Sequence, residues 1–386
     1  MIDSDNCLGE TSVEEFLTDY WQKKPLLIRN AFPDMKSPIS AEELAGLSCE
    51  EQVNGRLVLE TDGDYPWQVE FGPFEESRFT ELPESHWSLL VSDVEKHIPE
   101  TAALLKPFRF IPDWRVDDLM ISYAPDGGSV GAHTDAYDVF LIQLSGQRLW
   151  KIAENFPSQT LDDVDLCILE KFDAEDEWLL SAGDMLYLPP NVAHHGIAQG
   201  NSEPCLTASV GFRAPSLKTI TSDYINYLNE NVHDERRYQD VLAVKPKHHA
   251  VITDETVSHF IDYLKQGLSI EHDQVKNWLG QYCSDNKTYE DLLQERDVSN
   301  YHELAGLLHK YPLQRSPYSN FLYSYNDHGA LLFVNGESYQ VSSAFAESIC
   351  ESESIELQQL DEVMTADDKK TLLALYNGGA FIIDQP

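Results

Sequence analysis

Two histidines and an aspartate have the residue types and the spacing that a metal site needs. The segment GAHTDAYDVF places His133 and Asp135 two positions apart, just ahead of an apolar run. Alternate residues of a β-strand face the same side, about 7 Å apart along the chain, so both side chains can meet one ion. A second segment, GDMLYLPPNVAHHG, adds His194 and His195. Only one of two adjacent histidines on an extended strand can face that ion.

This set of ligands indicates one class of iron chemistry. Two imidazoles and one carboxylate on one face of a metal ion form the facial triad of non-heme Fe(II) oxygenases, which leaves three coordination positions open. A bidentate cosubstrate takes two of these positions and O₂ takes the third. A His-x-Asp pair alone is more often a surface pair or a structural hydrogen bond. The Gly…Pro-Pro…His segment favours the metal site, because both segments fall in a predicted β region.

The elements that must position these residues are predicted to be β-strands. Between about residues 117 and 213, short apolar runs are separated by Gly, Pro, Asn and Asp, which is typical of an antiparallel sandwich or barrel. Beyond Pro215 the pattern changes to amphipathic helices. The later stretch SNFLYSYNDHGALLFVNGESYQVS predicts strands joined by tight turns. Helices followed by a small hairpin favour a winged-helix-like domain at the C-terminal end.

The composition limits the function classes. A chain of 386 residues predicts two or three domains, and its 42% of apolar residues suffices for a sizeable core. A net charge of −39 argues against nucleic-acid binding, which needs Lys and Arg to displace counterions. The same charge fits solubility or adaptation to salt, and it equally fits attraction of a basic partner.

The cysteines and the termini predict a cytoplasmic protein. The six cysteines are scattered without a Cys-x-x-Cys pair, so neither a disulfide framework nor a structural zinc site is expected. The N-terminal segment has no basic head and no apolar stretch, so no signal peptide is expected. No apolar run approaches the roughly 18 residues of a membrane span, and no membrane contact is expected.

The two motifs resemble those of the JmjC-type 2-oxoglutarate oxygenases, with Gly183, Pro189 and His194 spaced as in cupins. The longer phrases YWQKKPLLIRNAF, DDLMISYAPDGGSVGAHTDAYDVF and SVGFRAP are similar to the bacterial ribosomal oxygenases, which hydroxylate an arginine of a large-subunit ribosomal protein. The likeness is strongest over about residues 13–215 and mainly architectural beyond.

The resemblance implies an α+β chain in three parts. Residues 1–215 are expected to form a double-stranded β-helix, the cupin or JmjC jelly roll, with N-terminal helices. Residues 216–285 are expected to form a helical dimerisation region, which makes the protein a homodimer. Residues 286–386 are expected to form the winged-helix-like domain.

The resemblance also assigns the metal and cosubstrate residues. His133, Asp135 and His194 match the ligands of Fe(II), with His194 preferred to His195 because its spacing from the preceding glycine fits. Arg148 matches the basic anchor for the distal carboxylate of 2-oxoglutarate, and its planar guanidinium suits a carboxylate.

Two neighbouring residues complete the expected cosubstrate site. Ser122 matches a position that hydrogen-bonds the cosubstrate, although a hydroxyl without function is equally compatible with the sequence. Lys151 is expected to face away from Arg148, because strand alternation places them on opposite faces.

The substrate side is assigned to Asp118, Tyr137 and Asp138, which resemble the family's substrate residues. A guanidinium calls for a carboxylate and an aromatic wall. A core position for Tyr137 and a solvated strand-end charge for Asp118 carry equal weight. The expected partner is a basic ribosomal protein.

Two rival functions remain at this level. The first is a related oxygenase that acts on a ribosomal histidine, a transfer RNA base or a methylated lysine. The second is a cupin-like module that binds metal without turnover. Arg148 argues against the module, since a structural metal site has no need of a carboxylate anchor.

Overall fold

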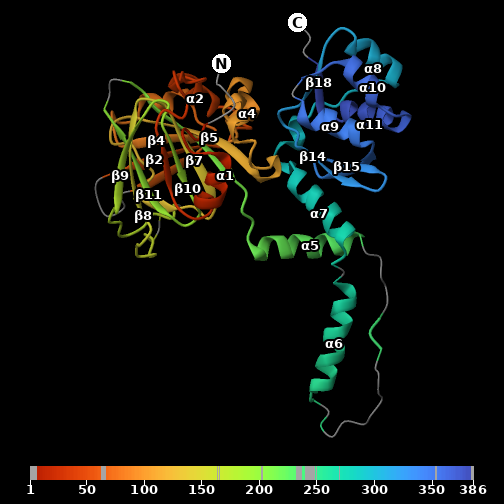
Figure 1. Ribbon diagram of the computed structural model, residues 1–386. Helices are drawn as coiled ribbons and strands as arrows, with labels where there is room; N and C mark the ends of the chain where they lie inside the picture. The colour runs from red at the N-terminus through yellow and green to blue at the C-terminus, as the bar shows by residue number, and fades with distance from the viewer. Residues whose placement is uncertain are drawn as a thin grey trace. The chain divides into compact units, whose positions relative to one another are not determined.

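The chain forms two compact units in the computed structural model, residues 1–214 and 215–386 (Figure 1). The boundary between the two units lies next to residue 215, where the JmjC-like part was expected to end. The second unit contains both residues 216–285, expected to be helical, and residues 286–386, expected to be winged-helix-like. The structure describes residues 7–61, 67–162, 164, 166–200, 203–231, 237–239, 248, 250–268, 270–352 and 354–383.

The first unit contains two antiparallel sheets. The small sheet has the order β6 (His133–Thr134), β11 (Ala193–Gln199), β8 (Gln147–Ala153) and β9 (Asp176–Ser181), and β8, β9 and β11 lie together at one side of the unit (Figure 1). The large sheet has the order β1 (Leu26–Ile28), β10 (Met185–Leu188), β7 (Asp138–Ser145), β12 (Cys205–Phe212), β5 (Val116–Ala124), β4 (Trp87–Val91), β2 (Gly55–Glu60) and β3 (Trp67–Phe71). The predicted α+β class with a jelly-roll core is confirmed.

Short helices cover the outer face of the large sheet. Phe16 and Phe108 from this layer contact Phe140 of β7, at ring-centroid distances of 5.6 and 4.6 Å. The layer therefore buries one face of β7 in an aromatic core. Its helical segments are α1 (Val13–Glu15), a π-helical turn (Phe16–Tyr20), α2 (Ala41–Leu47), α3 (Glu76–Thr80), α4 (Val94–His97) and 3₁₀ turns at Pro99–Leu104, Lys106–Phe108 and Asp113–Arg115.

Strand β7 is buried on both faces, as its nearly continuous apolar sequence requires. Phe140 and Ile142 point into the core under the helical layer. Val139 and Leu141 point the other way and pack with Trp150 of β8. Strand alternation thus separates a structural face of β7 from a face that looks into the space between the sheets.

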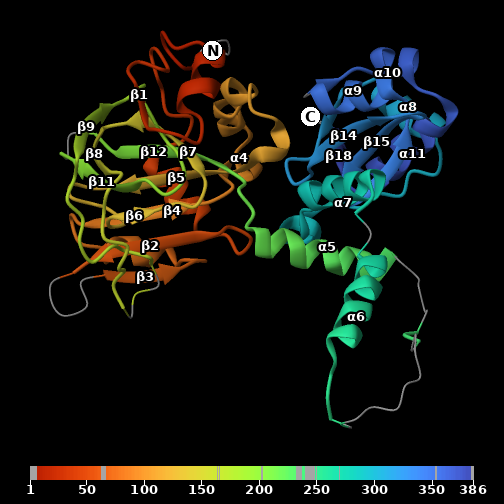
Figure 2. The ribbon, with the colours of Figure 1, turned by 60° about the horizontal axis from the view of Figure 1, so that its bottom comes forward.

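The second unit combines helices with two three-stranded sheets. Helices α7, α9 and α11 lie beside the sheet β14–β15–β16 (Figure 2). The elements are α5 (Leu217–Asn231), α6 (Asp254–Gly267), α7 (His272–Ser284), a 3₁₀ turn (Lys287–Leu292), α8 (Tyr301–Leu308), β13 (Leu313–Arg315), β14 (Phe321–Asn326), β15 (Gly329–Val334), β16 (Glu337–Val341), α9 (Ser343–Glu351), β17 (Ser354–Ile355), α10 (Leu357–Val363), α11 (Ala366–Asn377) and β18 (Phe381–Ile383). Across the described ranges, no helix has the length and apolar content needed to cross a membrane.

One buried carboxylate joins two helix starts in this unit. Asp368 accepts hydrogen bonds from the backbone N–H and hydroxyl of Ser342, the N-cap of α9, at 2.9 and 2.7 Å. It also accepts from the N–H and hydroxyl of Thr365, the N-cap of α11, both at 2.8 Å. Burial tends to raise the pKa of Asp368, but these hydrogen bonds outweigh burial and hold the pKa below its usual value. The carboxylate is therefore ionised and stabilises both helix ends.

We expect Asp368→Ala to destabilise the second unit by about 3 kcal/mol, because it removes charge-assisted hydrogen bonds and leaves buried donors without an acceptor. Asp367→Ala on the same helix is the control, since Asp367 is exposed and pairs with Lys370. Urea unfolding measures both changes. Equal free energies of unfolding for the two variants would contradict this role.

Candidate functional site

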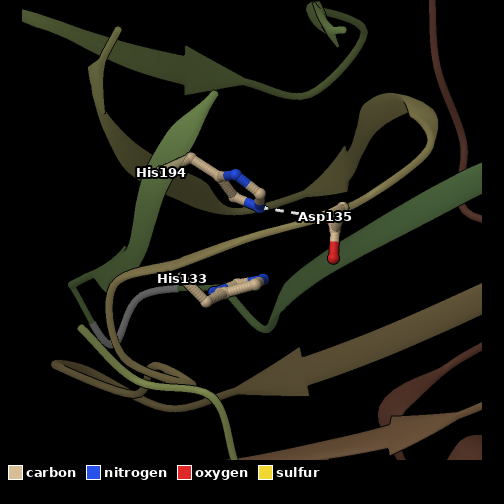
Figure 3. Close-up of side chains that lie close together, drawn as sticks. All are labelled: His133, Asp135 and His194. Carbon is tan, nitrogen blue, oxygen red and sulfur yellow. Dashed lines mark ion pairs between the residues drawn. The ribbon is translucent and has the colours of Figure 1, made fainter. Parts of the chain in front are cut away.

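Two strands of the small sheet bring the histidines together. In the antiparallel pair β6–β11, His133 lies directly opposite His194, and directly opposed residues share a face. Their ring centroids are 4.3 Å apart. Asp135 follows β6 by one residue, and its Oδ2 lies 3.5 Å from Nε2 of His194 (Figure 3). The ligand atoms of the three side chains all lie within 4.8 Å of one another.

The orientation of both imidazoles is fixed by backbone carbonyls. Nδ1 of His133 lies 3.0 Å from the carbonyl oxygen of Gly131, and Nδ1 of His194 lies 3.0 Å from that of Val192. A carbonyl only accepts, so each Nδ1 carries the proton and donates it. In the neutral form of each ring, Nε2 then has the free lone pair that a metal ligand requires.

Burial keeps His194 neutral. Desolvation, followed by the neighbouring His133, lowers the pKa of His194 to about 4. His195 occupies the opposite face of β11, where its ring meets Phe172 at a centroid distance of 6.2 Å. The structure thus places His194, and not His195, beside His133 and Asp135.

The side chains of Asp135 and Tyr137 are joined by a hydrogen bond. The Tyr137 hydroxyl donates a hydrogen bond to the Asp135 carboxylate, and burial together with this carboxylate raises the pKa of Tyr137. The Tyr137 residue as a whole is 40% exposed. Tyr137 therefore orients a candidate ligand while its ring lines the wall of the adjoining cavity.

A cavity of about 480 Å³ joins the three side chains to residues of both sheets. Arg148 of β8 lies in its wall and is only 3% exposed. Its Nε and Nη2 have no hydrogen-bond partner in the described part of the chain. A buried guanidinium without an acceptor is costly, so this position fits an anionic group that enters with a ligand. Lys151 faces away, as expected, and pairs with Glu177 at 3.0 Å.

Polar side chains of the large sheet line the same cavity. Ser122 of β5 lies opposite Thr207 of β12 and donates to its carbonyl oxygen at 3.4 Å. The Thr207 hydroxyl donates to Gln143 of β7 at 3.0 Å. These residues give the cavity a row of hydroxyl groups on the sheet opposite Arg148.

The expected substrate residues separate into two groups. Asp118 and Tyr137 both line the cavity. Asp138 does not, and here the structure corrects the expectation. Its carboxylate is fully buried on the outer face of β7, where it accepts hydrogen bonds from Tyr187 at 2.6 Å and from Gln22 at 3.0 Å. Asp138 directly follows Tyr137, and strand alternation turns the two side chains to opposite sides.

The ligand set fits a metal ion of a particular kind. Two imidazoles and one carboxylate suit Fe(II) and leave part of the coordination sphere open. The neighbouring cavity and the unpartnered Arg148 guanidinium provide room and charge for an acidic cosubstrate. This arrangement is the one expected of an oxygenase centre.

Comparison with known proteins decides the family. Models of the JmjC domain and of the ROXA-like winged helix match residues 103–220 and 263–381. The chain is 37% identical to the ribosomal protein uL16 3-hydroxylase of Escherichia coli over 279 residues, which is 72% of this chain and 73% of the relative. The chain belongs to the bacterial JmjC ribosomal oxygenases.

Two further similarities bear on the site of this ribosomal oxygenase. It is 41% identical to a probable ribosomal oxygenase of Haemophilus influenzae over 56% of this chain and 53% of the relative. It also resembles the structure of the Escherichia coli ribosomal oxygenase YcfD in complex with cobalt and 2-oxoglutarate, with 30% identity, a TM-score of 0.80, and coverage of 97% of this chain and 99% of the other.

Several cavity residues of this ribosomal oxygenase escaped the sequence prediction. Trp150 lies two positions after Arg148, and Thr207 and Ser209 alternate within a buried strand, so the period-two pattern could have found all three. Arg56 lies on a distant strand and carries no such signal.

We expect Gly196→Ala to weaken cosubstrate binding. Gly196 lies opposite Trp150 in the pair β8–β11, and a Cβ there would come within 2.7 Å of the indole ring. The ring would have to move within the cavity wall, so we expect the KM for 2-oxoglutarate to rise about tenfold. Gln199→Ala at the exposed end of the same strand is the control. Succinate release at varied 2-oxoglutarate measures the change, and an unchanged KM would refute it.

Proposed function

We propose that this ribosomal oxygenase uses Fe(II) and 2-oxoglutarate to hydroxylate an arginine side chain of the large-subunit ribosomal protein uL16. One observation carries the proposal. A single cavity holds the facial triad, the unpartnered guanidinium of Arg148, and a wall formed by Asp118 and Tyr137. The target protein follows from the uL16 3-hydroxylase relative, and the arginine follows from the chemistry of the cavity.

Different residues of the chain would bind the iron and the cosubstrate. His133, Asp135 and His194 would hold the iron, and Arg148 and Ser122 would bind the cosubstrate. Iron with 2-oxoglutarate and O₂ supplies the oxidation that inserts oxygen into an unactivated C–H bond.

The substrate side must hold a charged group beside the metal. The Asp118 carboxylate would accept hydrogen bonds from the guanidinium, and the partly exposed Tyr137 ring would stack against it. Val139, Leu141 and Trp150 form apolar walls that exclude water from the reacting carbon.

The charge of the whole chain supports a basic protein as partner. A net charge of −39 would attract a lysine- and arginine-rich ribosomal protein and raise its association rate. The same charge would repel nucleic acid. Since free ribosomal proteins occur where ribosomes are assembled, we place the reaction in the cytoplasm.

The decisive assay combines the protein with Fe(II), 2-oxoglutarate, O₂ and a uL16 peptide. We expect succinate and a gain of about 16 daltons on one arginine. Asp118→Asn should raise the KM for the peptide about tenfold or more, because a charge-assisted hydrogen bond is lost. Asp113→Asn, an exposed residue just ahead of the same strand, is the control. Modification of a histidine or lysine in place of the arginine would contradict the proposed target.

The same assay separates the enzyme from a metal-binding module. An enzyme forms succinate that disappears on Asp135→Ala, because this change removes the only carboxylate of the triad. Metal binding without any succinate from the wild-type protein would favour the module.

We also propose that the helical region mediates a homodimer. On α6, Val257, Phe260, Ile261 and Leu264 recur at helical spacing and are between 43% and 59% exposed, and α6 buries none of its residues. In the described part of the chain, the Tyr238 ring stacks on Phe260 at a centroid distance of 4.4 Å, and the apolar side chains of this face remain exposed. An amphipathic helix with an exposed apolar face favours association with a second chain.

Phe260→Asp combined with Leu264→Asp should therefore convert a dimer to a monomer, because it places charges on the apolar face. Gln266→Asp, on the opposite face of α6, should leave the dimer intact. Light scattering after size-exclusion chromatography measures the mass. A wild-type protein with the mass of one chain would refute the dimer.

A further inference from the structure

Several carboxyl groups cluster behind the cavity wall that Asp118 and Tyr137 form. Helix α4 packs against β5, which brings Glu95 close to Asp118. Oε2 of Glu95 accepts a hydrogen bond at 3.2 Å from the backbone N–H of Leu119, the residue next to Asp118. Glu95 therefore fixes the strand at the point where Asp118 turns toward the cavity.

Positive charge is scarce in this cluster. Lys96 is ion-paired with Asp93, and Arg213 pairs with Asp117 at 3.3 Å. In the part of the chain that the structure describes, no lysine or arginine lies within ion-pair distance of Glu95 or Asp118. Asp118 is hydrogen-bonded by the Ser92 side chain.

The surroundings of Asp118 and Glu95 disfavour the ionised form of both carboxyl groups and raise their pKa. Desolvation, with Asp93 and Asp117 contributing, raises the pKa of Asp118 to about 7. Desolvation also raises the pKa of Glu95 to about 8, against the opposing effect of Lys96. The charged and titratable groups around the pair are Asp93, Lys96 and His97 at α4, Asp117 on β5, Arg56 on β2, Arg213 after β12, and Tyr137.

We propose that Glu95 is a positioning residue that acts through Asp118, so that the two carboxyl groups together select a side chain with a full positive charge and release protons when it binds. This inference rests on the proposed function, because it takes Asp118 as the contact of the substrate guanidinium. A neutral side chain of similar shape would leave both groups protonated and would gain no ion pair. A bound arginine would bring a cation within ion-pair distance of Asp118 and would keep its own proton.

The direction of the pH effect follows from this linkage. A bound cation lowers the pKa of both carboxyl groups, so binding expels the protons that they hold in the free protein. Affinity for an arginine peptide should therefore rise as the pH increases through about 7 and 8, and level off above. Replacing Glu95 by glutamine preserves the acceptor for Leu119 and removes one of the two titrations.

Calorimetry tests the proton release directly. The holoenzyme with Fe(II) and 2-oxoglutarate is kept free of O₂ and titrated at pH 7 with a uL16 peptide that contains no histidine, in two buffers of different ionisation enthalpy. The wild-type protein should release protons on binding, Glu95→Gln should release fewer, and Glu100→Gln, an exposed neighbour of α4, should match the wild type. If the wild-type protein binds the peptide without releasing protons, that result by itself would overturn the proposal.

Kinetics separates positioning from a general loss of structure. At pH 8.5, Glu95→Gln should raise the KM for the peptide about fivefold, with the change in KM exceeding any change in kcat. At pH 6, where both groups are protonated, its KM should approach that of the wild type. Superimposed KM–pH profiles would overturn the role of Glu95 and leave the proposed function standing. If the arginine peptide stimulates no hydroxylation by the wild-type protein, the proposed function fails, and this inference fails with it.

Discussion

The antiparallel pairing of β6 with β11 is the constraint on which the whole site depends. It sets His133 opposite His194, and a slip by one residue would turn one imidazole away from the other. Three features stabilise this register. The N–H of Asn191, a residue in the left-handed conformation, donates to the carbonyl oxygen of Asp135 at 2.7 Å. Strand β11 also pairs along its full length with β8, and the absence of a side chain at Gly196 lets the Trp150 ring pack against it.

Strand β7 divides the first unit into a structural side and a chemical side. On the structural side, Asp138 ties Tyr187 of β10 and Gln22 of the N-terminal layer to the sheet. On the chemical side, Arg148 is buried, and its Nε and Nη2 have no acceptor among the described residues. The buried Asp138 carboxylate has hydrogen-bond donors around it, whereas the buried Arg148 guanidinium across the cavity lacks acceptors for Nε and Nη2 within the ranges that the structure describes. The two charges are therefore buried in opposite ways. We propose that the carboxylate of a bound cosubstrate completes the second arrangement, so that part of the cosubstrate's binding energy would come from relief of this penalty.

Local patterns predicted much of the fold and most of the metal centre. Period-two alternation and turn residues were enough to predict the β core, and the two motifs were enough to predict that His133, Asp135 and one of the adjacent histidines could meet. The choice of His194 over His195 came from the family resemblance. Asp138 shows the limit: its place near the metal motif and its resemblance to the family's substrate residues suggested the cavity, but alternation from Asp135 would have placed it on the other face. Glu95 and Arg56 were not predictable, because their closeness to the cavity depends on how α4 and β2 approach β5. Such tertiary contacts between distant segments leave no period in the sequence.

Anomalous diffraction tests the central claim most directly. Crystals grown without O₂ in the presence of Fe(II) would be measured on both sides of the iron absorption edge. We predict one strong iron peak in the first unit, bonded to Nε2 of His133, Nε2 of His194 and the carboxylate of Asp135. A peak bonded instead to His195, or crystals in which these three side chains bind no iron, would contradict the account.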